Sequence, residues 1–224
     1  FKDFDLGEIA AYIDWAPFFH TWGIKGLYPD LLDHKEKGAE ARKLILDAQK
    51  TLALLIEKNL LSANGIIGLF PANSMEEDIL VYDPDEPDLT VGHFHFLRNQ
   101  ELKQKGNQAN ISLSDFICPA GTGKKDYLGC FALCIHGADQ MAAKHIAQGD
   151  EYEAIMIKAI ADRLAEAFAE LLHHRVRTHY WGYSKDEKLN LTQLLKGAYL
   201  GIRPAPGYPA CPDHGEKQTI FNLL

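Results

Sequence analysis

The segment 203–208, Arg-Pro-Ala-Pro-Gly-Tyr, combines residue types that can hold a small charged ligand. Arg203 is a permanent planar cation that can bind a carboxylate through two parallel hydrogen bonds. Backbone can approach a ligand closely at Gly207, amides near Ala205 and Gly207 can meet polar edges, and the Tyr208 ring can stack or donate. The segment predicts a cradle for an amino-acid-like ligand. The alternative is a structural loop whose arginine caps the C-terminus of a helix.

Two carboxylates lie four residues apart in a strongly helical stretch. Asp162 and Glu166 therefore face the same side of the predicted helix. With Arg163 adjacent, the usual outcome is a solvated array of surface charges. A functional role requires a cation to meet the acids, and a sulfonium ligand with an α-amino group would bring two positive charges.

Asp14 lies in a dense aromatic cluster, Tyr-Ile-Asp-Trp-Ala-Pro-Phe-Phe at 12–19. Carboxylates are rarely left in apolar surroundings without a partner. Asp14 therefore either meets a ligand or caps a turn or helix start before Pro17.

The histidines and cysteines do not match a known metal signature. His93 and His95 alternate on one face of a predicted strand, while Cys130, Cys134 and His136 are loosely spaced. The sequence contains no HExxH, paired CxxC, GxGxxG or P-loop motif, which argues against metalloprotease, zinc-ribbon, Rossmann and nucleotide-triphosphatase classes. We therefore expect no metal site.

The elements that must position these residues are predicted from hydrophobic periodicity and turn composition. The expected helices span 38–61, 138–179 with a break at Gly149, and 189–200. The expected strands are 65–70, 78–82 and 89–96, an antiparallel meander with turns at 71–74 and 83–87, and a further strand at 127–135. Because strands cluster ahead of helices, an α+β arrangement is favoured over alternating βαβ units.

The segment 203–214 contains four of the ten prolines and is expected to be a stiff extended loop. Asp213, followed three positions later by Glu216, resembles a capping box at the start of a last helix. The apolar face of that helix is expected to be exposed; it consists of Ile220, Phe221, Leu223 and Leu224.

The composition is that of an ordinary globular chain, with 224 residues, 46% hydrophobic and 24% charged. The net charge is −8 and the basic residues are scattered, so nucleic acid and anionic membranes are poor candidates for partners. No apolar run approaches the roughly 20 residues of a membrane helix and no signal peptide opens the chain, so we expect a cytoplasmic protein. The four cysteines are then expected to be reduced thiols.

Five segments, in this order and spacing, resemble the signature blocks of the activation domain of cobalamin-dependent methionine synthase. They are YIDWAPFF (12–19), GLFPANS (68–74), ADRLAEAFAE (161–170), RVRTHYWGY (175–183) and GIRPAPGYPACPDH (201–214). The resemblance implies a C-shaped α+β domain over residues 1–224, with a twisted antiparallel sheet flanked by helices. Family members continue beyond the position of Leu224, so the resemblance also implies that the family's C-terminal segment, which completes the ligand groove, lies outside this chain.

The resemblance further implies that S-adenosylmethionine lies in a shallow groove of the domain. The family's ligand contacts correspond to Asp14, Glu166, Arg203, Ala205, Gly207 and Tyr208. Asp162 corresponds to an acid that faces the cobalamin-binding domain. No residue of this chain is implied as a catalyst.

The implied reaction is the reductive remethylation of cob(II)alamin, held by the cobalamin-binding domain of methionine synthase. The electron would come from a flavodoxin-like or diflavin reductase, and this domain would position the methyl donor. The chain would then be part of a methyltransferase and not a complete enzyme. The alternative is a docking module that holds the corrinoid domain without binding S-adenosylmethionine. A free-standing methyltransferase is less favoured, since no activating base or glycine-rich nucleotide loop lies near the motif.

Overall fold

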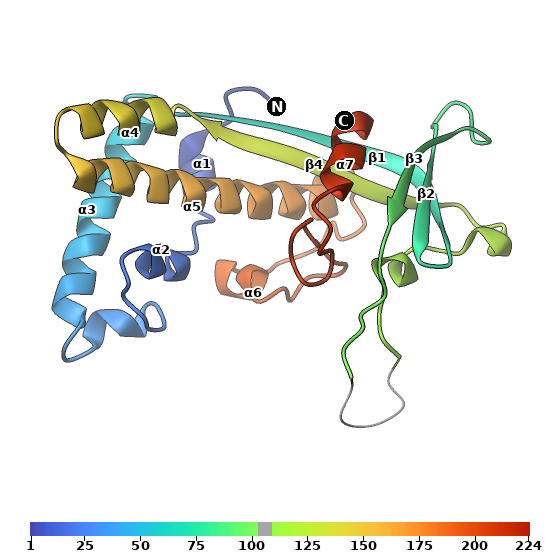
Figure 1. Cartoon of the computed structure of the whole chain (residues 1–224), viewed down its shortest axis with the longest axis horizontal. Helices are drawn as coiled ribbons and strands as arrows, with labels where there is room; N and C mark the ends of the chain where they lie inside the picture. The colour runs from blue at the N-terminus through green and yellow to red at the C-terminus, as the bar shows by residue number, and fades with distance from the viewer. Residues whose placement is uncertain (103–108) are drawn as a thin grey trace. The chain divides into compact units, whose positions relative to one another are not determined.

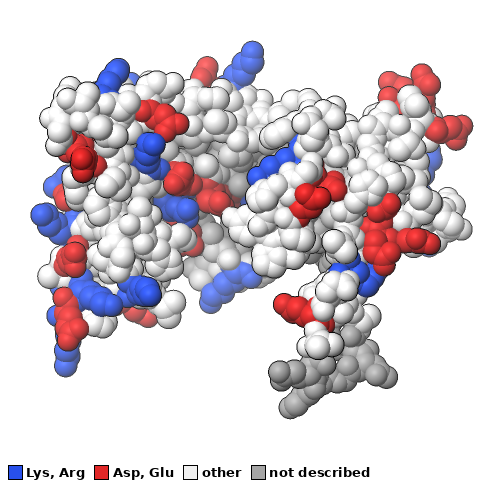
Figure 2. Space-filling model, in the orientation of Figure 1, with Lys and Arg blue, Asp and Glu red and all other residues white. Residues whose placement is uncertain are grey.

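The computed structural model describes residues 1–102 and 109–224. The chain divides into two compact units, unit 1 (Phe1–Gly65 and Leu133–Leu200) and unit 2 (Ile66–Ala132 and Gly201–Leu224). The residues of the expected single domain thus fall into two units. Within the described residues, no helix has the length and apolar character needed to cross a membrane. On the face drawn in Figure 2, acidic and basic side chains are interspersed.

Unit 1 is built around the long helix α5 (Glu151–Arg175) (Figure 1). Most of its predicted apolar stripe is buried, with Leu164 and Phe168 fully enclosed, and each such side chain contributes about 1.5–3 kcal/mol. Ile155, which was expected in the stripe, is instead 45% exposed. The helices in contact with α5 are α1 (Leu6–Ala10), α2 (Ala16–Thr21), α3 (Gly38–Glu57) and α4 (Ala138–Ala147). The predicted break is confirmed, because Gly149 has a φ of 77° and Asp150 caps α5 by accepting the Glu153 amide. After α5 the chain makes a π-helical turn, Val176–Tyr180.

Two predicted helices are shorter in the structure than in the sequence pattern. The helix expected over 38–61 ends at Glu57, because Asn59 adopts a φ of 48° and the Leu60 amide turns back to the Leu55 carbonyl. The helix expected over 189–200 is reduced to α6 (Leu191–Leu195). The remaining short 3₁₀ turns are Asp30–Asp33, Leu113–Phe116 and Ala120–Thr122.

The four strands form one sheet in the order β3-β2-β1-β4. Their bounds are Ser62–Met75 for β1, Asp78–Tyr82 for β2, Thr90–His95 for β3 and Asp126–His136 for β4. The β1–β2 and β2–β3 pairs are antiparallel, so the predicted meander is confirmed, and the fourth predicted strand lies beside β1. Ile79 and Val81 alternate into the core of unit 2, which also contains Phe94.

The turn predicted at 71–74 is wrong, because β1 continues through this segment. Pro71 is tolerated there because registered pairing with β2 begins one residue later, where Ala72 lies opposite Val81. The reversal instead comes at a two-residue turn that starts at Glu76, whose φ is 57°. Glutamate is an unusual residue at a left-handed turn position, so the composition gave no signal for it.

The last helix, α7 (Glu216–Leu223), begins without the expected capping box. The Asp213 carboxylate accepts the amide of Gly215, which is the N-cap residue. The Glu216 carboxylate, instead of turning back on its own helix, accepts the amide of His95 on β3 at 3.1 Å.

The expected exposure of the apolar face of α7 is also wrong for most of its residues. Ile220, Leu223 and Leu224 pack against the hydrophobic core of the sheet in unit 2. Phe221 is the exception, with 61% of its surface exposed. The apolar side chains that were expected to be exposed therefore cover the sheet.

Candidate functional site

The loop after α6 is held in shape by its own backbone. The Gly207 amide donates to the Cys211 carbonyl at 2.7 Å, and the Tyr208 amide donates to the Ala205 carbonyl at 3.2 Å. The Cys211 amide closes a second turn onto the Tyr208 carbonyl at 2.9 Å. The predicted absence of helix and of regular strand in this segment is confirmed, apart from an isolated Tyr208–Cys211 bridge. Because the Gly207 amide is used inside the loop, any ligand contact at this glycine would depend on close approach instead of this donor.

Gly207 is required by the local geometry of the loop. Its φ is 100°, which lies outside the usual conformations of residues with a side chain. A Cβ at this position would lie 2.2 Å from Cε1 of the His214 ring. The glycine therefore permits both the backbone turn and the packing of His214 on it.

The side chains of the same loop remain accessible. Tyr208 is 59% exposed, Ala205 is exposed and Arg203 is half-buried. The following residues of the loop border a cavity of about 500 Å³ within unit 2. Residues that line this cavity include Glu77, Asp78, His95, Arg98, Cys211 and Asp213.

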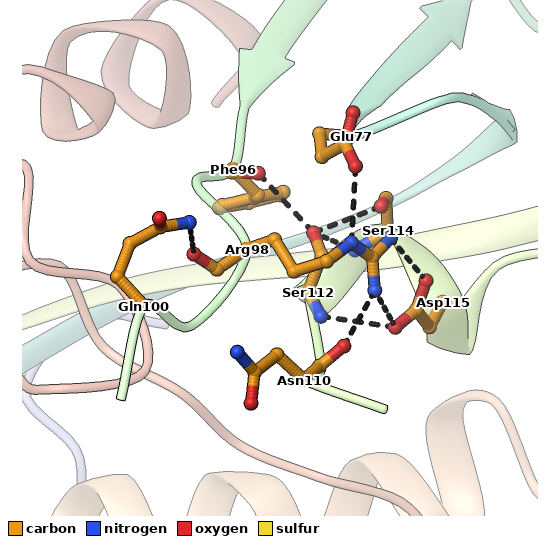
Figure 3. Close-up of polar contacts among 8 residues, drawn as sticks. All are labelled: Glu77, Phe96, Arg98, Gln100, Asn110, Ser112, Ser114 and Asp115. Atoms are coloured by element: carbon orange, nitrogen blue, oxygen red, sulfur yellow. Dashed lines mark hydrogen bonds and ion pairs between the residues drawn. The ribbon is translucent and has the colours of Figure 1, made fainter. Parts of the chain in front are cut away.

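Arg98, which borders this cavity, makes several polar contacts with its neighbours (Figure 3). Its guanidinium binds the Asp115 carboxylate through two hydrogen bonds of 2.7 and 2.9 Å. It also donates to Glu77 at 3.0 Å and to the Asn110 carbonyl at 2.8 Å. The Ser112 amide also donates to Asp115, at 2.9 Å. The Arg98 guanidinium therefore joins Glu77, Asn110 and Asp115, and we call this group the Arg98 clamp.

The electrostatics of this clamp favour the charged forms of both partners. Hydrogen bonds from Arg98, and then from the Ser112 amide, lower the pKa of the Asp115 carboxyl to about 2. The pKa of Arg98 is raised by Asp115 and Glu77. The guanidinium has its donors directed at protein acceptors.

In unit 1, α5 presents Asp162 and Glu166 on its exposed side, opposite buried Leu164. Among the described residues, neither acid makes a hydrogen bond or an ion pair, and Arg163 does not pair with them. The predicted shared face is therefore confirmed, and both acids are exposed, as in the solvated array of surface charges that the sequence also allowed. The pair is a locus of uncompensated negative charge that suits a cation.

Asp14 lies between α1 and α2, both of which contact α5. Its Oδ1 accepts the amide of Ala16 at 2.9 Å, which is the turn-capping arrangement that the sequence left open. The carboxylate keeps further acceptor capacity, so this bond is compatible with a ligand contact. Asp162 and Glu166 thus lie on α5, and Asp14 lies in the connection between two helices that contact α5.

The sequence analysis missed a buried ionic cluster in the RVRTHYWGY block. Arg177 is fully buried and binds Glu187 through two hydrogen bonds of 2.9 and 2.7 Å. Its third contact is His173 Nδ1 at 2.7 Å, and its guanidinium lies 4.0 Å from the centre of the Tyr199 ring. The hydrogen bond from Arg177 lowers the pKa of Glu187. Glu170 is also buried and lies seven residues before Arg177, which is two helical turns. Polar residues that recur at helical spacing on the buried face could have predicted this cluster from the sequence.

The predicted ligand residues consequently fall into two sets. Unit 1 contains Asp14 and Glu166, together with Asp162; unit 2 contains Arg203, Ala205, Gly207 and Tyr208. The first set consists of acids, and the second includes a guanidinium and an exposed phenol.

Comparison with known proteins gives the same assignment as the signature blocks. Residues 5–224 match the family model described as the activation domain of vitamin B12-dependent methionine synthase. The chain is also similar to a solved structure, the MetH reactivation domain bound to AdoHcy, with 46% sequence identity and a TM-score of 0.92. This similarity covers 98% of the present chain and 67% of the other. The chain belongs to the family of vitamin B12-dependent methionine synthase activation domains.

Proposed function

We propose that this chain binds S-adenosylmethionine and presents its methyl group for the reductive remethylation of cob(II)alamin in methionine synthase. The observation that carries the proposal is the similarity, over 98% of the chain, to a reactivation domain bound to AdoHcy. AdoHcy is what remains of S-adenosylmethionine after its methyl group has been transferred. The ligand of the related domain is therefore the product of the proposed reaction.

The charges of the candidate residues fit this ligand. S-Adenosylmethionine has one carboxylate, one ammonium and one sulfonium group. Arg203 offers a guanidinium for the carboxylate, while Asp14 and Glu166 offer negative charge for the two cationic groups. Tyr208 exposes its ring for stacking, and Ala205 and Gly207 are exposed residues at which a ligand can approach the backbone.

The contribution of this chain is to position the methyl donor. When bound, the sulfonium supplies an activated methyl group, and reduced cobalamin held by the cobalamin-binding domain supplies the nucleophile. No side chain of this domain has to remove a proton, so Asp14 and Glu166 act as counter-charges and not as acid and base. Asp162, exposed on α5, would face the cobalamin-binding domain, and a flavodoxin-like or diflavin reductase would supply the electron.

The direct test is a reconstitution with separate components. The chain is mixed with a cobalamin-binding domain in the cob(II)alamin state, a reductase and S-adenosylmethionine carrying a labelled methyl group. Label should appear on cobalamin only when the chain and the reductase are both present. If the chain changes the cobalamin spectrum equally with and without S-adenosylmethionine, and no label is transferred, the chain is a docking module.

Arg203→Lys separates the proposed role of this residue from a simple charge effect. Lysine keeps the positive charge but cannot form the two parallel hydrogen bonds to a carboxylate. The loss should be about 1.5–3 kcal/mol, or about ten- to hundredfold in affinity, and close to that of Arg203→Ala. Affinity of Arg203→Lys equal to that of the unmodified chain would exclude bidentate binding.

A further inference from the structure

We propose that Asp78, His93 and His95 form a binding site for a divalent transition-metal ion of the Zn²⁺ type. The sequence analysis expected no metal site, because the two histidines alone match no signature. The third ligand comes from the neighbouring strand, and sheet register brings it next to them. All three residues lie in unit 2.

The strand geometry explains why the three side chains converge. His93 and His95 are two residues apart on β3, so they project from the same face, and their ring centroids are 4.2 Å apart. Asp78 on β2 lies directly opposite His95 in the antiparallel register. Cross-strand partners on one face are close enough for their side chains to meet.

The ligand atoms are already near metal-binding distances of one another. His93 Nε2 lies 2.9 Å from Asp78 Oδ2, and His95 Nδ1 lies 3.1 Å from Asp78 Oδ1. One ligand atom from each residue lies within 4.8 Å of the others. Ligands bound tetrahedrally at about 2.0–2.2 Å lie roughly 3.3–3.6 Å apart, so small side-chain rotations suffice to enclose an ion.

The donor set selects the class of ion. Two imidazole nitrogens and one carboxylate suit Zn²⁺ and related transition metals, whereas Ca²⁺ and Mg²⁺ prefer oxygen ligands throughout. The side chains are 41%, 65% and 30% exposed for His93, His95 and Asp78, so an ion can reach them.

The surroundings of the site hold its backbone and add space. Buried Glu216 of α7 accepts the His95 amide at 3.1 Å, which fixes the backbone of β3 at this ligand. Asp78 and His95 also border the cavity of about 500 Å³. Three protein ligands leave a coordination position, which water or an anionic ligand in this cavity can fill.

The test is titration of the full chain with Zn²⁺ by calorimetry, and with Co²⁺ by visible absorption. We expect one ion per chain. Asp78→Asn and His95→Gln should each weaken binding by more than about tenfold, because each removes one of three ligands. His20→Gln, which changes an exposed histidine of unit 1, is the matched control and should bind like the unmodified chain.

Three results would overturn the proposal. The first is an unmodified, folded chain that binds neither ion. The second is equal affinity in His95→Gln, Asp78→Asn and the unmodified chain, with folding verified by circular dichroism. The third is a Co²⁺ spectrum with thiolate charge-transfer bands, since these would place the ion on cysteine.

Discussion

Gly207→Ala tests whether the loop of unit 2 owes its shape to the glycine. The substitution forces a side chain onto a residue with a φ of 100°, which costs about 1–3 kcal/mol. The new Cβ would also lie 2.2 Å from the His214 ring, so the ring must swing out into solvent. If the backbone relaxes instead, the 2.7 Å hydrogen bond from Gly207 to Cys211 is lost, at about 1 kcal/mol.

Gly123→Ala is the matched control for this experiment. Gly123 also lies in unit 2 with a positive φ, 68°, but a Cβ there meets no atom within 4 Å. Its substitution should cost only about 1–2 kcal/mol for the left-handed conformation. Urea unfolding followed by circular dichroism should therefore show a greater loss for Gly207→Ala, by about 1 kcal/mol or more.

The outcome also bears on ligand binding. Because Gly207 lies between Arg203 and Tyr208, a distorted loop should weaken binding of S-adenosylmethionine more than Gly123→Ala does. In a Gly207→Ala background, His214→Ala should have less effect than in the unmodified chain, since the ring has already been displaced. Equal destabilisation by Gly207→Ala and Gly123→Ala would refute the steric argument.

Three further predictions concern the charged groups. Arg177→Met should reduce the free energy of unfolding by about 3–5 kcal/mol, because it leaves the Glu187 side chain charged and buried. Adding Glu187→Leu should restore part of the loss. If urea unfolding showed that the effects of the two substitutions simply add, the two residues would not be coupled as described. The pKa of Asp115 in the folded chain is lowered to about 2, so the stabilisation from its charged form is present above the ordinary pKa and is lost as the pH falls from about 5 towards 2. Asp115→Asn should therefore flatten the dependence of Tm on pH in that window. An unchanged slope would count against the role of the ion pair with Arg98. Asp14→Asn should weaken S-adenosylmethionine binding without introducing a new pH dependence of activity, whereas loss of a bell-shaped profile would indicate proton transfer.

Regular elements with a strong hydrophobic period were predictable from the sequence. The stripe of α5 and the alternation of β2 depend on neighbours within the same element, so the periods of 3.6 and 2 are sufficient to identify them. The break at Gly149 was predictable for the same local reason.

Features that depend on distant partners were not predictable. The turn expected at Pro71 was wrong because β1 continues through the proline, which lies just before the part of the strand that pairs with β2. The apolar face of α7 is covered by a sheet that is distant in the chain; Glu216 of α7 and His95 of β3, for example, are 121 residues apart. Arg98 and Asp115 are 17 residues apart and carry no periodic signal, so their pairing appears only in the structure.

The candidate site was partly predictable from residue chemistry. Composition identified Arg203 and Tyr208 as ligand-binding types, but the resemblance, and not the spacing, assigned them to S-adenosylmethionine. The structure added that the amide of Gly207 is used within the loop and that Asp14 caps a turn. Neither detail follows from sequence, because each depends on backbone conformation.

Calorimetric titration of the chain with S-adenosylmethionine tests the central claim most directly. The account predicts one binding site per chain, competition by AdoHcy for the same site, and affinity lowered about ten- to hundredfold in Arg203→Lys. Circular dichroism of each sample verifies that the protein is folded. A folded chain that binds neither ligand, or an Arg203→Lys variant that binds both as well as the unmodified chain, would contradict the account.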